Sequence, residues 1–219
     1  MDAHDEEQRW GADVGGVDAL VRELRDAGGA VEHQAADFAD PVAPEMLVTS
    51  TFDSFGRLDV VVANHARSAS QSLEQLTAAE LDLSYAVNVR ATLLLIQAFA
   101  DRYDRHDGGR VILFTSGQYH SAMPAELPYI ASKAALRELT ASLAVSLMPR
   151  GITVNCVDPG PNDTGYADDQ TIAELAARIP GGRWGTPADT ARLVAWLASD
   201  DASWVTGQVI ASDGGWSAL

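Results

Sequence analysis

The segment RVILFTSGQYHSAMPAELPYIASK, residues 110–133, holds the most informative pattern in the chain. It opens with a continuous apolar run, which is typical of a strand buried on both faces of a sheet. Tyr129 and Lys133 stand four residues apart at the start of a predicted helix over 129–147, so their side chains share one helix face. Ser116 follows the strand directly. Because open α/β sheets bind ligands beyond the carboxyl ends of their strands, these three side chains are expected to meet there.

Apolar runs and helical patterns alternate along the whole chain. Residues 58–63 and 152–157 are two further continuous apolar runs, and shorter runs lie at 30–36 and 208–211. Helical patterns cover residues 17–27, 41–55, 78–103, 129–147, 172–179 and 187–198. Strands that alternate with helices are typical of βα units. The sequence therefore predicts one α/β domain over residues 1–219, with a mostly parallel sheet covered on both faces.

Two of the predicted helices begin at recognisable capping residues. Asp40 followed by Pro41 fits an N-cap with proline in the first helical position. Thr77 and Glu80 fit a capping box, in which the side chain of each residue accepts a hydrogen bond from the backbone amide of the other.

The charge balance argues against one class of partner. The chain has 31 acidic and 15 basic residues, a net charge of −16. Nucleic-acid binding needs clustered Lys and Arg to neutralise phosphates, so no nucleic-acid partner is expected. Cys156 is the single cysteine and lies in an apolar run, which predicts a buried free thiol.

The sequence shows neither a secretion signal nor an apolar run of membrane-spanning length. Residues 1–16 are acidic and polar, and the longest apolar run, 91–100, is too short to cross a bilayer. A reducing, cytoplasmic location is the expectation.

Tyr129 and Lys133 together predict proton transfer. A phenol has a pKa near ~10, and a nearby ammonium favours the phenolate and lowers that pKa. With Ser116 placed to hold a substrate oxygen, the set suits general acid–base catalysis at a carbonyl or an alcohol. Tyr119 has Met123 four residues later and so lacks such a cationic partner. No spacing of His, Cys and Asp indicates a metal site.

These motifs resemble the short-chain dehydrogenase/reductase family over essentially the whole chain. Ser116 with Tyr129-x-x-x-Lys133 is similar to the family's catalytic serine and Tyr-x-x-x-Lys, and Asn88 in YAVNVRAT is similar to its helix asparagine. The run from 182 to 215 closely resembles the family's C-terminal segment. Further matches are Asp37, Asn64, Pro159, Gly160 and Thr164.

The resemblance implies a Rossmann-like fold and an NAD(P)-dependent oxidoreductase that acts on a carbonyl or secondary alcohol of a small molecule. Tyr129 would exchange a proton with the substrate oxygen, which Ser116 orients. Lys133 would lower the pKa of the tyrosine and bond the nicotinamide ribose, and Asn88 would support a water of the proton relay. Cofactor contacts are implied at Asp37, Asn64, Pro159, Gly160 and Thr164. A homodimer or homotetramer is also implied, formed through the helices at 80–103 and 129–147.

The start of the chain departs from the family's pattern. The family opens with a strand, a T-G-x-x-x-G-x-G turn, a helix and a second strand, and its glycines let the backbone approach a pyrophosphate. Here the nearest glycines are Gly11, Gly15 and Gly16, with Asp18 where the third glycine would stand. The pattern predicts that the first βαβ unit, about 30 residues, is absent. Ala66 also replaces the glycine of the family's Asn-Asn-Ala-Gly.

Without the family's first strand, the strand at 58–63 would have an unpaired edge. One hypothesis is that residues 30–36 move beside it and complete a five-stranded sheet, which a right-handed crossover permits.

Three functions stay open on these residues. The first is the oxidoreductase, whose natural start would lie upstream of Met1. The second is a catalytically impaired remnant or subunit without cofactor binding. The third is a lyase resembling the halohydrin dehalogenases, although these carry arginine where this chain has Lys133.

The substrate and the choice between NAD and NADP also stay open. The loop at 160–183 is expected to shape the substrate pocket. His65, Arg67 and His120 are either contacts of the site or ordinary polar loop residues.

Overall fold

The fold is centred on a four-stranded parallel sheet. The computed structural model describes residues 15–105, 107–165 and 167–218. The strands are β1 (Val60–Ala63), β2 (Gly109–Phe114), β3 (Ile152–Asp158) and β4 (Val209–Ala211), and they lie side by side in chain order. The register pairs Val61 with Val111, Leu113 with Cys156 and Val157 with Ile210. These strands confirm the four runs predicted at 58–63, 110–115, 152–157 and 208–211.

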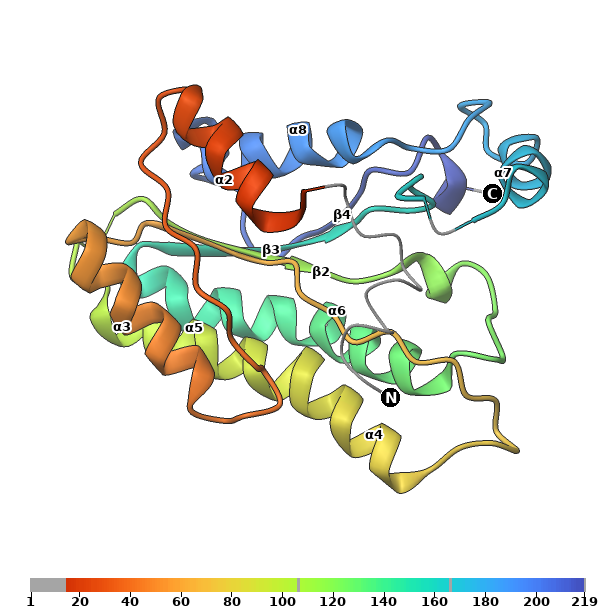
Figure 1. Ribbon diagram of the computed structural model, residues 1–219, viewed down its shortest axis with the longest axis horizontal. Coiled ribbons are helices and arrows are strands. Elements are labelled where there is room, and N and C mark those ends of the chain that lie inside the picture. The colour runs from red at the N-terminus through yellow and green to blue at the C-terminus, as the bar shows by residue number, and fades with distance from the viewer. Residues whose placement is uncertain (1–14, 106, 166, 219) are drawn as a thin grey trace.

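Helices cover both faces of the sheet, as the sequence predicts. In Figure 1, α4, α5 and α6 lie below the sheet and α8 lies above it. The helices are α2 (Gly16–Asp26), α3 (Ala43–Phe55), α4 (Ala78–Tyr85), α5 (Ala91–Arg102), α6 (Leu127–Leu147), α7 (Asp169–Ala176) and α8 (Pro187–Ala198). All predicted helices are thus present among the described residues, with ends that differ by a few positions.

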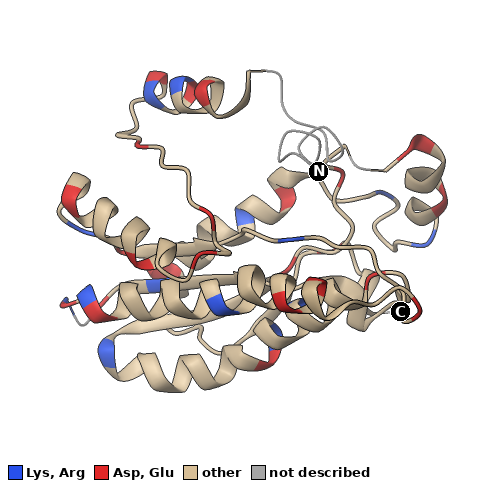
Figure 2. Cartoon of the chain, turned by 60° about the horizontal axis from the view of Figure 1, so that its bottom comes forward, with Lys and Arg blue, Asp and Glu red and all other residues tan. Residues whose placement is uncertain are grey.

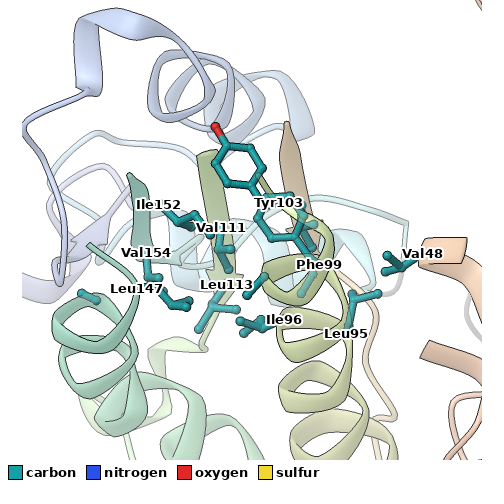
Figure 3. Close-up of a cluster of buried hydrophobic side chains, with 14 of the residues drawn as sticks. Val48, Leu95, Ile96, Phe99, Tyr103, Val111, Leu113, Leu147, Ile152 and Val154 are labelled. Atoms are coloured by element: carbon teal, nitrogen blue, oxygen red, sulfur yellow. The ribbon is translucent and has the colours of Figure 1, made fainter. Parts of the chain in front are cut away.

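The core consists of two apolar layers, one on each face of the sheet. On the lower face, alternate strand residues such as Val111 and Leu113 pack against Phe99 of α5 and Leu147 of α6 (Figure 3). On the upper face, Ile112 and its neighbours pack against α8. Alternate residues of one strand pack into opposite layers, and the strand sequences are therefore apolar throughout.

The long helix predicted at 78–103 is continuous but not uniform. Its first segment α4 and last segment α5 are joined by a π-helical turn at Ala86–Arg90. By length and composition it could cross a membrane, unlike the shorter apolar run considered above, yet 61% of its most apolar window is buried in the fold. Such burial is what the core helix of a globular domain shows.

The prediction of a strand at residues 30–36 is wrong. Residues 30–36 form no strand and are exposed, apart from the half-buried Val31. The five-stranded hypothesis fails with it, because β1 is an edge of the sheet with β2 as its partner. A strand needs a partner to satisfy its backbone groups, and residues 30–36 pair with none of the four described strands.

Two further corrections concern the first helices. Asp40 does not cap a helix starting at Pro41: its carboxylate accepts a bond from the Val42 amide, and α3 starts at Ala43. Helix α2 is amphipathic as predicted but buries no residue, and Figure 2 shows it standing away from the rest of the fold.

Candidate active site

The carboxyl ends of the parallel strands gather most of the predicted site residues on one edge of the sheet. Ser116 stands two residues after the end of β2, and Pro159-Gly160 follows β3. Two bonds tie β2 to α6 at this edge: Lys133 Nζ donates to the Phe114 carbonyl at 3.1 Å, and Thr115 Oγ1 donates to the Lys133 carbonyl at 3.2 Å. Lys133 is thereby held within two residues of Ser116, as the sequence predicts.

Lys133 is an ionisable group placed in the interior. Only 3% of the residue is exposed. Burial disfavours the ammonium and lowers the pKa of Lys133 to about 8. The lysine is therefore still mostly cationic at neutral pH, and its charge favours the ionised form of a neighbouring acid.

Tyr129 lies in the first turn of α6, half-buried, four residues before Lys133. Its backbone carbonyl accepts a bond of 2.8 Å from Ser132 Oγ. The sequence spacing therefore places Tyr129 and Lys133 on one helix face, next to the carboxyl ends of the strands. The acid–base role of Tyr129 stays a prediction.

Asn88 is fully buried in the π-turn and joins two other segments. Its Oδ1 accepts from the Arg67 amide at 2.6 Å, and its Nδ2 donates to the Arg67 carbonyl at 2.9 Å and to Ser132 Oγ at 2.8 Å. Both amide hydrogens of the side chain are thus engaged. Asn88 ties the loop after β1 to the residue beside Lys133.

Arg67 also joins the loop after β1 to helix α4 through its side chain. Its guanidinium makes two bonds, of 2.7 and 2.8 Å, to the Glu80 carboxylate. Glu80 was predicted to close a capping box with Thr77. Thr77 does cap α4 through the Glu80 amide at 3.2 Å, but the Glu80 carboxylate bonds Arg67 and Ser84 instead. A pairing across 13 residues of sequence has no local signal, so neither the ion pair nor Ser132 was recognised from the sequence.

A second polar group lies where β3 ends. Asp158 is fully buried: Oδ1 accepts from the Gly160 amide at 3.0 Å, while Oδ2 has no partner within hydrogen-bond distance among the described residues. His120 Nε2 lies 3.7 Å from that oxygen. His120 is thus an exposed residue of the loop after β2, as one of the two alternatives has it, and its ring edge lies beside a buried carboxylate.

Tyr119 differs from its sequence-based interpretation in one respect. It does have a cation nearby, because the Arg137 guanidinium lies 4.2 Å from the centre of its ring. Burial and the Asp158 carboxylate nevertheless raise the pKa of Tyr119 above its ordinary value. The phenolate is thus disfavoured at Tyr119, which makes this tyrosine a poor proton-transfer group.

The predicted cofactor contacts are only partly brought together. Asp37 is exposed, and its Oδ1 accepts from the Ala39 amide at 2.9 Å. Its neighbour Phe38 packs against His65 after β1. This contact brings Asp37 towards Asn64 at the same edge of the sheet. Thr164 is exposed in the loop after β3, away from regular structure.

Gly160 is a glycine for a structural reason. Its φ is +59°, and an added Cβ would lie 2.4 Å from Asp213 Cβ. The space beside the Cα of Gly160 is thus occupied by Asp213.

For a nicotinamide cofactor, the candidate contacts at this edge of the sheet are Asn64, Lys133 and Pro159-Gly160, and the candidate contact of the adenine is Asp37. Gly15 and Gly16 open α2, which buries no residue, and Gly11 lies outside the described residues. Between residues 15 and 218, no glycine-rich turn joins a sheet strand to a helix in the way a phosphate cradle does.

A cavity of about 460 Å³ lies at the opposite, amino-terminal edge of the sheet. Its lining includes Arg57, Arg102 and Arg105, and Arg57 and Arg105 both pair with Asp59. The cavity is remote from the predicted site.

Comparison with known proteins decides the family. The family model described as enoyl-(acyl carrier protein) reductase matches residues 10–217. The chain belongs to the short-chain dehydrogenase/reductase family. The resemblance read from Ser116, Tyr129 and Lys133 is thereby confirmed at the level of the family and its Rossmann-like fold.

Relatives within the short-chain dehydrogenases/reductases are similar over most of the chain. The uncharacterized oxidoreductase YjdA of Bacillus subtilis is 40% identical over 208 residues, covering 94% of this chain and 83% of that protein. A metagenomic blue fluorescent protein in complex with NADPH superposes with a TM-score of 0.85 at 34% identity, over 94% of this chain and 85% of the other. A short-chain dehydrogenase from Burkholderia cenocepacia in complex with NADP gives 0.84 at 35% identity, over 91% and 82%.

Proposed function

We propose that this short-chain dehydrogenase/reductase interconverts a carbonyl and a secondary alcohol with NAD or NADP, and that Tyr129 is its general acid and base. The observation that carries the proposal is Lys133. A buried lysine with a pKa of about 8 stands four residues after a tyrosine, at the strand edge where the family binds its ligands. Burial of an ionisable group at such a position is a common mark of catalytic function.

The protein side of the reaction follows from these residues. In the reductive direction the Tyr129 hydroxyl donates its proton to the carbonyl oxygen, which the Ser116 hydroxyl holds by a hydrogen bond. The Lys133 ammonium stabilises the phenolate that is left. In the oxidative direction the phenolate takes the alcohol proton back. A bound nicotinamide cofactor would supply or accept the hydride.

Two relatives with NADP(H) in their structures support a nicotinamide cofactor. Lys133, Asn64 and Pro159-Gly160 would hold its nicotinamide end, and Asp37 its adenine end. No phosphate cradle lies among the described residues, so these candidate contacts concern only the two ends of the cofactor.

Titration with NADPH and NADH tests cofactor binding, with the five tryptophans as fluorescence reporters. A saturable response followed by reduction of a small ketone supports the proposal, and Tyr129→Phe should then lower kcat by about 10²- to 10⁴-fold. An active Tyr129→Phe variant would exclude Tyr129 as the acid and base.

A second function has one observation in its favour. β1 forms an open edge of the sheet, and the phosphate cradle is not among the described residues. This combination suits a non-catalytic member of the family. Absence of any saturable response to either nucleotide would select this function over the oxidoreductase.

We further propose that the protein acts on a small molecule as a homodimer or homotetramer. Leu81, Tyr85 and Val145, on the helices at 80–103 and 129–147, are 36%, 55% and 78% exposed. Exposed apolar side chains on these two helices are candidates for a subunit interface. Light scattering after size-exclusion chromatography would measure the mass, and a monomer at micromolar concentration would contradict this proposal.

A further inference from the structure

The π-turn at residues 86–90 has a backbone requirement that the helix alone does not meet. In this turn the amide of Ala91 bonds the carbonyl of Ala86, five residues back instead of four. Such an inserted residue leaves a carbonyl in that turn without its usual amide donor. A buried carbonyl without a donor is unfavourable, so a group from outside the helix is expected to bond it.

His65 supplies that donor. Its Nε2 lies 3.1 Å from the carbonyl oxygen of Val87 and 3.2 Å from Thr92 Oγ1. The Thr92 hydroxyl donates its hydrogen to the Asn88 carbonyl at 2.8 Å, so its oxygen can only accept from the imidazole. Both contacts therefore require a hydrogen on Nε2, which fixes the tautomer of the ring.

The imidazole is held neutral and in place. Phe38 packs against it with 4.3 Å between the ring centres and 47° between the ring planes. Burial, with a smaller effect of the Lys133 charge, lowers the pKa of His65 to about 4. At neutral pH His65 thus acts as a fixed, uncharged hydrogen-bond donor.

The bond from His65 is one end of a chain of contacts that leads to Lys133. Two residues further on, the backbone of Arg67 is bonded in both directions to the Asn88 side chain. Asn88 in turn bonds Ser132, the residue before Lys133. The loop after β1, the π-turn and the start of α6 are thereby fixed to one another.

We propose that His65 is a positioning residue, which secures the π-turn through the Val87 carbonyl and so holds Asn88, Ser132 and Lys133 in their active arrangement. The inference rests on the proposed function for the task of Lys133, whereas its contacts can be tested without any cofactor.

Two substitutions separate the hydrogen bond from the packing. His65→Leu keeps an apolar body against Phe38 but removes the donor, and His65→Gln restores an N–H at a similar reach. The same change at the exposed His33, His33→Leu, is the matched control. Should His65→Leu not fold, His65→Asn, with a side chain one carbon shorter than glutamine, replaces it.

Two measurements report on the contacts that join the loop after β1, the π-turn and the start of α6. Hydrogen exchange of the Arg67 amide, which donates to Asn88, should become about tenfold faster in His65→Leu, the change expected for one lost hydrogen bond. Lys133 is the only lysine of the chain, so ¹³Cε-labelled lysine gives one signal from which its pKa can be measured. Because His65 is neutral above pH 6, its loss removes no charge, and a rise of the Lys133 pKa from about 8 reports a changed position.

The proposal requires both readouts to change in His65→Leu, to return in His65→Gln and to stay constant in His33→Leu. Equal behaviour of the leucine and glutamine variants would overturn it, as would unchanged values in His65→Leu. Neither readout needs nucleotide or substrate, so failure here is distinct from failure of the proposed oxidoreductase activity.

Discussion

Substitution of Lys133 by methionine should make the protein more stable while it removes the proposed activity. The pKa of Lys133 is lowered from 10.5 to about 8, because burial penalises the ammonium. With about 1.4 kcal/mol for each pKa unit, the charge destabilises the folded state by about 3 kcal/mol at pH 7. Methionine has a similar length and no charge. Loss of the bond to the Phe114 carbonyl offsets about 1 kcal/mol, so a net gain of about 2 kcal/mol is expected.

The pH dependence of this difference carries the sharper test. Below pH 8 the lysine is protonated in both the folded and the unfolded chain, and the penalty is constant. Between pH 8 and 10.5 the unfolded chain binds the proton and the folded chain does not, so the stability of the parent rises by about 1.4 kcal/mol per pH unit. Lys133→Met lacks this group, so its advantage of about 2 kcal/mol should shrink at this rate above pH 8 and disappear at about pH 9.5.

Urea unfolding of both proteins at pH 7, 8, 9 and 10 measures the difference, and other titrating groups cancel in the comparison. The ¹³Cε signal of the single lysine gives its pKa independently. A variant less stable than the parent at pH 7, with a difference that does not vary with pH, would refute the reasoning. So would a lysine signal that titrates near 10.5. A residue that lowers stability at a ligand-binding edge is expected to be kept for function.

Further predictions concern residues around the site. Gly160→Ala should destabilise the fold by about 2 kcal/mol or more, because its Cβ would meet Asp213 and its φ is +59°; thermal unfolding measures this, and an unchanged melting temperature would contradict it. Ser132→Ala should speed hydrogen exchange of the Arg67 amide by a few-fold, since Asn88 loses its bond to Ser132; unchanged exchange would show that Asn88 is held without it. Thr77→Ala should lower the unfolding free energy by about 1 kcal/mol through the lost cap of α4, as followed by urea unfolding, and a loss below a few tenths would contradict the cap.

The sequence predicted the parts of this fold that rest on local periodicity. The runs at 58–63, 110–115 and 152–157 are apolar throughout because each strand packs layers on both faces, and all three are strands of the sheet. The order of strands and helices then required a parallel sheet. Parallel strands present their carboxyl ends on one edge, which is why Ser116 and Lys133 could be placed near each other from sequence alone.

What sequence could not decide depends on partners that lie far away along the chain. Residues 30–36 have a strand-like composition, but a strand must also pair with a neighbour, and only the tertiary structure shows that this segment pairs with none of the described strands. The pairing of Glu80 with Arg67, the π-turn around Asn88 and the bond from His65 to Val87 join segments 13 or more residues apart. The segment at 110–133 by itself thus indicated the residues proposed for acid–base catalysis. The contacts that hold them in register were decided by packing, because a hydrogen bond between distant segments leaves no periodic trace in either one.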